Sequence, residues 1–161
     1  MNTSVILVFR EYQKVLSGHT EIYSIHICID KYMKKSLLTN CLNIARDYIP
    51  KHCQYNCFLH YSFIIQNNSI IEWSTNKVGE PPIHMGYHKR IGAVPKLHSE
   101  ILAYRKAKGL LGKNSFEIVN IRLNKQGELR LSKPCICCLE ILTDLGCKRF
   151  YYSYEGGFLS T

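Results

Sequence analysis

Apolar residues recur along the chain with two periods, one typical of strands and the other typical of helices. Alternation and short apolar runs predict strands over residues 5–9, 22–30, 58–65, 70–75, 116–123 and 148–154, with a short return strand over 128–131. Apolar spacing of three and four predicts helices over residues 31–48, 97–108 and 132–145. Strands interleaved with helices indicate one α/β domain over 1–161, with a sheet between helical layers.

Turn-forming and helix-breaking residues predict where these elements end. Gln66-Asn67-Asn68-Ser69 predicts a hairpin turn, and Pro50 is expected to stop the first helix. Ser132 suits the N-cap of the last helix, with Pro134 in its first turn. Residues 76–96 are rich in Gly and Pro and show no period. Because a loop of this length leads directly into a helix, we expect it to be functional.

Composition narrows the class of protein. The hydrophobic fraction of 46% and the charged fraction of 20% are ordinary for a globular chain. No apolar run reaches the length of a membrane span, and residues 5–9 lack the flanks of a signal peptide. Eight cysteines in a chain with this much core favour a reduced, cytoplasmic protein over a secreted disulfide framework. We therefore expect no membrane partner.

The charge of the chain favours partners that carry phosphate. The formal net charge is +9, and the segment from Lys77 to Lys113 holds eight Lys or Arg against two Glu. Within it, Lys89, Arg90 and Lys96 are expected to attract a nucleotide or a nucleic acid. A solvated basic face that only aids solubility is the alternative.

Two short motifs carry the candidate chemistry. The first is His98-Ser99-Glu100, and the second is Pro134-Cys135-Ile136-Cys137-Cys138. With five prolines and eight cysteines, P-C-x-x-C is expected only about 0.01 times by chance. One imidazole and two thiolates make a three-ligand zinc site that leaves a fourth position for water.

Helix geometry indicates how the two motifs would work together. Cys135 and Cys138 are three residues apart, so both point to one side of a helix whose dipole stabilises thiolates in its first turn. His98, in the first turn of the other helix, would complete the ligand set for Zn2+. Glu100 lies about 200° around that helix from His98. We therefore expect Glu100 to be the catalytic proton carrier and not a ligand.

Other candidates fit metal chemistry less well. His19-Thr20-Glu21 repeats the H-x-E spacing but lies beside a predicted turn, far from any cysteine pair. Cys137 is the neighbour of Cys138 and therefore projects elsewhere around the helix. A second metal site in segment 52–60 has a spacing that fits no standard zinc pattern, and buried cysteines with surface histidines are the alternative. Its residues would be His52, Cys53, Cys57 and His60.

From about residue 58 to 154 the chain resembles the cytidine and deoxycytidylate deaminase superfamily, whose signature is H-x-E followed by P-C-x-x-C. The order hairpin, H-x-E helix, strand, P-C-x-x-C helix, strand carries this resemblance. Ser132-Lys133-Pro134-Cys135 and Arg149-Phe150-Tyr151-Tyr152-Ser153 are similar to compact members. Ser99 departs from the usual Ala, residues 1–30 have no counterpart, and many members continue beyond the last strand. The resemblance implies a three-layer α/β/α fold with a mixed central sheet.

The resemblance also implies an activity, namely zinc-dependent hydrolysis of a cytosine base to uracil with Glu100 as the catalytic residue. We expect a free (deoxy)cytidine nucleoside or nucleotide as substrate. Single-stranded DNA or RNA, adenine in place of cytosine, and a non-catalytic zinc-stabilised module that binds nucleic acid are the alternatives; a homo-oligomer is left open.

Two substrate contacts follow from the resemblance. Asn76 resembles the family asparagine that contacts the sugar, and a role as a turn residue is its alternative. Tyr154, with Tyr151 and Tyr152, resembles the aromatics that stack on a base, and strand packing is the alternative for these tyrosines.

Overall fold

The computed structural model describes residues 11–16, 19–24, 33–52, 59–76, 86–88, 92–94 and 98–161. Two small antiparallel hairpins belong to this set. One pairs β1 (Glu11–Leu16) with β2 (His19–Ser24), and the other pairs β5 (Gly86–His88) with β6 (Gly92–Val94). The remaining described elements form one sheet and the helices that cover it.

The central sheet has six strands and mixes the two pairing directions. Its strands are β3 (Leu59–Gln66), β4 (Ser69–Thr75), β7 (Phe116–Leu123), β8 (Leu129–Arg130), β9 (Cys147–Tyr154) and β10 (Gly157–Ser160). The strand order is β10-β9-β7-β3-β4, and β8 pairs with β7 beyond the end of the β7–β9 ladder. Only β7 and β9 are parallel to each other.

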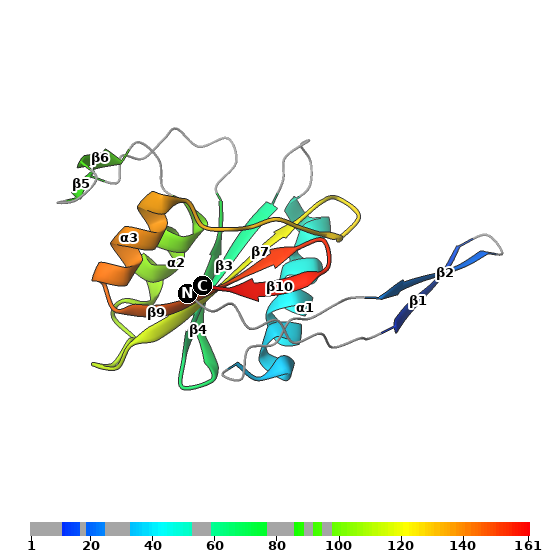
Figure 1. The fold of residues 1–161 in the computed structure, drawn as a ribbon, viewed down its shortest axis with the longest axis horizontal. Helices are drawn as coiled ribbons and strands as arrows, with labels where there is room; N and C mark the ends of the chain where they lie inside the picture. Colours follow the sequence, from blue (N-terminus) through cyan, green and yellow to red (C-terminus); the bar gives the residue numbers. More distant parts are fainter. Residues whose placement is uncertain are drawn as a thin grey trace.

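Helices cover both faces of this sheet. Helix α1 (Lys35–His52) lies on one face, and α2 (Ser99–Ala107) and α3 (Ile136–Asp144) lie on the other, as Figure 1 shows. The expected three-layer α/β/α fold with a mixed central sheet is therefore confirmed.

The period of two along the strands divides the core between the two faces of the sheet. On β3, the side chains of Tyr61, Phe63 and Ile65 pack with α1, whereas Ile64 packs with α2 and α3. Strand β7 alternates in the same way, with Ile121 on the α1 side and the opposite face covered by α2 and α3. Because both faces are covered, a polar side chain on β3 or β7 is buried and needs a hydrogen-bonding partner.

Strand direction places the starts of two helices at the same edge of the sheet. Strand β3 is antiparallel to both β4 and β7, so β4 and β7 run in the same direction. Helix α2 is the next main element after β4, and α3 follows β7 and its short partner β8. Both helices therefore begin at the edge where β4 and β7 end, which is the edge where open α/β sheets usually bind ligands.

Most of the expected elements are confirmed, including the β3–β4 hairpin. Its turn residues Asn67 and Asn68 both have positive φ, 52° and 58°, which is the conformation of a type I′ turn. The prediction that Pro50 ends the first helix was wrong, because α1 continues to His52. A proline removes one backbone N–H, and one lost bond does not prevent two more helical residues.

Other strands differ from expectation. The first hairpin pairs β1 with β2, whereas the sequence predicted strands over 5–9, which lies outside the described residues, and over 22–30, which begins after the start of β2. The segment 76–96 was expected to be a loop, yet it contains β5 and β6. Strand β10 was missed because four residues after a turn give too short a pattern to recognise. Among the described residues, none of the helices is both long and apolar enough to cross a membrane.

Stability should depend on the α1 side of the core. Phe63 is fully buried and stacks on Trp73, with ring centroids 6.0 Å apart. Phe63→Ala should lower the free energy of unfolding by about 3–5 kcal/mol, because it leaves a cavity under α1. Leu110→Ala is the control, since that side chain is 63% exposed, and its change should stay within about 0.5 kcal/mol. Equal losses in urea unfolding would contradict this assignment of the core.

Candidate metal centre

His98 lies immediately before α2 and is exposed to solvent. It is the N-cap residue, with extended backbone angles (φ −82°, ψ 159°), so it precedes the first helical turn in which the sequence placed it. Its side chain caps no backbone N–H of the helix. The imidazole is therefore available for another partner.

Both cysteines of the candidate site lie at the start of α3. Cys135 is the N-cap residue, and its Sγ accepts a hydrogen bond from the Cys138 N–H at 3.5 Å. The prediction of Ser132 as the N-cap was wrong, because the Ser132 hydroxyl donates instead to the Asn120 carbonyl at 2.9 Å. Pro134 lies just before the helix rather than in its first turn.

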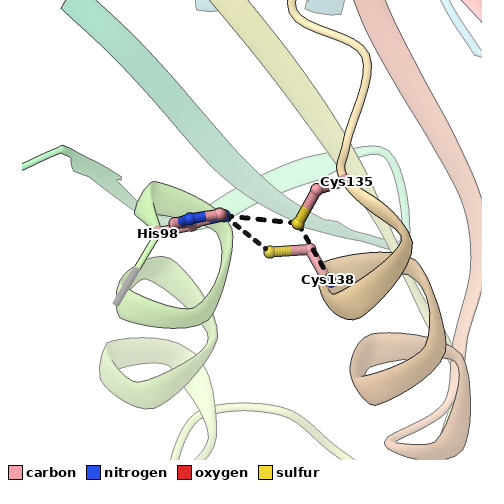
Figure 2. A group of neighbouring side chains, drawn as sticks. All are labelled: His98, Cys135 and Cys138. Carbon is pink, nitrogen blue, oxygen red and sulfur yellow. Dashed lines mark hydrogen bonds between the residues drawn. The ribbon is translucent and has the colours of Figure 1, made fainter. Parts of the chain in front are cut away.

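The three predicted ligands point toward one another from the starts of α2 and α3, as Figure 2 shows. His98 Nδ1 lies 3.4 Å from Cys135 Sγ and 3.3 Å from Cys138 Sγ. In a tetrahedral zinc site with ordinary bond lengths, a nitrogen and a sulfur ligand are about 3.5 Å apart. The three atoms therefore have the spacing of one face of a tetrahedral metal site.

The residues of this group fit a cation chemically as well as geometrically. Burial raises the pKa of the Cys138 thiol above its usual range, and the negative charges of Glu100 and Cys135 raise it further. Burial thus outweighs the helix dipole that was expected to favour the thiolate. A metal ion supplies the positive charge that an ionised thiolate needs at this position.

Neither Glu100 nor Cys137 is a member of the ligand group. The group has three members, whose ligand atoms all lie within 4.8 Å of one another. Glu100 is 7% exposed and close enough to Cys138 to affect the pKa of its thiol. A buried carboxylate therefore lies next to the ligand group without taking part in it.

Hydrogen bonds hold both oxygens of the Glu100 carboxylate. Oε1 accepts from Asn120 Nδ2 at 3.1 Å, and Oε2 accepts from Ser99 Oγ at 3.2 Å. Ser62 lies opposite Asn120 in the β3–β7 pairing and contacts both Asn120 and Ser99. The position of the carboxylate is thus determined by α2 together with two central strands.

Sequence reasoning missed Ser62 and Asn120 as residues of the site. Both are polar residues within apolar strands, and both are at most 3% exposed. That combination was a usable signal, because a polar side chain in a strand covered on both faces needs a specific partner. Ser99 was noted only as a departure from the usual Ala.

Positive charge lies close to His60 on β3. Burial, with the charges of Arg122 and His98, lowers the pKa of His60 to about 4, so His60 is neutral at pH 7.

Asn76, at the end of β4, accepts a hydrogen bond from the His60 backbone N–H at 2.8 Å through its side chain. Its predicted contact with a sugar stays a prediction.

The three tyrosines on β9 differ in exposure. Tyr151 and Tyr152 are 2% and 7% exposed and pack within the fold, which confirms strand packing for both. Tyr154 is half-buried, and its ring lies over Gly156 in the turn to β10. Lys89, Arg90 and Lys96 lie outside the described residues, so their expected part in binding stays a prediction.

Among the residues that the structure describes, the ligand group has no member besides His98, Cys135 and Cys138. His19 and Glu21 lie on β2, and Cys53 and Cys57 fall outside the described residues. Cys41 and Cys147 are buried free thiols, and burial raises the pKa of each to about 12. These two therefore serve as small core residues.

Comparisons with models of protein families, with curated proteins and with solved structures found no match.

The composition of the ligand group predicts which of three neighbouring cysteines are needed for metal binding. Cys135→Ala and Cys138→Ala should each lose the bound metal and much of the protein's stability, because ligand binding contributes to folding. Cys137→Ala is the matched control and should keep the metal, since its thiol lies outside the ligand group. Metal analysis of the purified variants is the measurement. A requirement for Cys137 but not for Cys135 would contradict the assignment.

Proposed function

We propose that this protein is a zinc-dependent hydrolytic deaminase that converts a cytosine base to uracil. One observation carries the proposal. A buried carboxylate, Glu100, lies beside a group of one imidazole and two thiolates and is held by hydrogen bonds outside that group. This pairing of a metal-ligand set with a separate proton carrier is what hydrolytic deamination requires.

The donor set supports zinc as the metal. Two thiolates and one imidazole suit zinc better than they suit magnesium or calcium, which prefer oxygen ligands. When bound, zinc would act as a Lewis acid that lowers the pKa of a water molecule to about 7, which makes a nucleophile available at neutral pH. His98, Cys135 and Cys138 would hold the ion.

Glu100 would move the proton in this reaction. Its carboxylate accepts a proton from the attacking water and delivers it to the ring nitrogen next to the amino-bearing carbon. The second proton of the water goes to the amino group, which leaves as ammonia when the carbon–nitrogen bond breaks. The base thus gains one oxygen from water and loses one nitrogen.

A structural zinc module is the competing function for the same residues. Structural zinc sites usually have four protein ligands, whereas the group among the described residues has three. A structural site also has no use for a buried carboxylate anchored next to it. Both features favour catalysis.

We propose a free (deoxy)cytidine nucleoside or nucleotide as the substrate. The burial of Tyr151 and Tyr152 supports this choice, because buried rings are not available to stack on the bases of a single strand. The net charge of +9 supports a substrate that carries phosphate. Single-stranded nucleic acid is the alternative that the substrate screen below would reveal.

The role of Glu100 is tested by a single conservative change. Glu100→Gln should keep the fold and the metal while lowering ammonia release by about 10²-fold or more, because the amide cannot carry the proton. Metal content and the urea unfolding midpoint serve as controls. Turnover near that of the unaltered protein would rule out Glu100 as the proton carrier.

The substrate is tested by a product screen and a salt series. Mass spectrometry should find uracil products from cytidine, deoxycytidine or their monophosphates. Activity on these should fall only slightly with added salt, because one nucleotide forms few phosphate contacts. Deamination of a single-stranded oligonucleotide alone, with a steep loss of activity in salt, would reverse the choice of substrate.

A further inference from the structure

We propose that Asn120 is the positioning residue for the Glu100 carboxylate and that Ser62 sets the orientation of Asn120. The catalytic meaning of this assignment rests on the proposed deaminase function. The geometry itself rests on four buried side chains from three elements. Together they form a ring that runs from Glu100 through Asn120, Ser62 and Ser99 back to Glu100.

The contacts around this ring are short and its members are nearly inaccessible to solvent. Asn120 Nδ2 donates to Glu100 Oε1 at 3.1 Å, and Ser62 Oγ donates to Asn120 Oδ1 at 2.8 Å. Ser62 Oγ and Ser99 Oγ are also 2.8 Å apart. None of the four side chains is more than 7% exposed. Bonds in such surroundings constrain geometry strongly, because an unpaired buried group is costly.

The number of hydrogen-bond protons on each side chain shows that Asn120 is the donor to Glu100. A carboxylate only accepts, so the Asn120 amide must turn its nitrogen to Glu100 and its oxygen to Ser62. Ser99 has a single hydroxyl proton and two acceptors, Ser62 at 2.8 Å and Glu100 at 3.2 Å. The Asn120 amide nitrogen carries two protons, so its hydrogen bond to Glu100 does not compete with a second acceptor in this way. Its bond to Glu100 is therefore the one that fixes the carboxylate.

Asn120 also connects the carboxylate to the segment that leads to Cys135. Its backbone carbonyl accepts from Ser132 Oγ at 2.9 Å, and its Nδ2 lies 3.5 Å from the Ser132 carbonyl. Strand β7 pairs with β3 on one side and β9 on the other, so Asn120 is on a rigid element. Sites held by such elements keep their geometry better than sites held by loops.

The test compares two isosteric substitutions. Asn120→Asp removes the donor to Glu100, whereas Gln66→Glu makes the same amide-to-carboxylate change at a buried site on β3 whose amide hydrogen-bonds to Asn114 and Gly112. For ammonia release from cytidine, deoxycytidine and their monophosphates, N120D should lower kcat about 10- to 100-fold with little change in KM. Q66E should lose stability but keep kcat. Equal kcat values for N120D and the unaltered protein would overturn the proposal.

A second measurement does not depend on activity. In zinc-loaded protein, N120D places two carboxylates together and should lower the urea unfolding midpoint clearly. Adding Glu100→Gln to N120D restores a donor–acceptor pair. The new amide at position 100 donates, and the new carboxylate at position 120 accepts. The double variant should therefore unfold at higher urea than N120D alone, although it carries one more substitution.

The two readouts separate the two proposals. If the effects of E100Q and N120D on the urea unfolding midpoint simply add, the side chains are not coupled and Asn120 does not position Glu100. If the stability rescue is present but the unaltered protein deaminates none of the four substrates, the proposed function fails for these substrates while the contact between Asn120 and Glu100 stands.

Discussion

The pairing of β3 with both β4 and β7 is the constraint on which the rest of this structure depends. Because β3 is antiparallel to each neighbour, β4 and β7 end at the same edge of the sheet. The helices that follow them must therefore begin there. His98 and Cys135, the two N-cap residues, come together for this reason although 37 positions separate them along the chain.

The same pairing also builds the surroundings of Glu100. The register sets Ser62 directly across from Asn120 on the face that α2 covers. A shift of β7 by one residue relative to β3 would turn Asn120 toward α1 and leave Glu100 without its donor on β7. The ligand group and Glu100 are thus positioned by the same sheet.

Much of this structure could be predicted from sequence, and the rest could not for physical reasons. Periodicity located β3, β4 and β7 and the helices, and motif spacing identified His98, Cys135 and Cys138. Periodicity does not show which residue caps a helix, so Cys135 was expected inside the first turn of α3, whereas it is the N-cap residue. The bond between Ser62 and Asn120 spans 58 positions, and only strand register reveals it.

X-ray absorption at the zinc edge tests the central claim most directly, because it counts the ligand atoms by type. We predict two sulfur atoms at about 2.3 Å, one imidazole nitrogen at about 2.0 Å and one further light atom, which is the coordination of a catalytic site. A third sulfur, or a protein purified without zinc that does not take it up, would contradict the account.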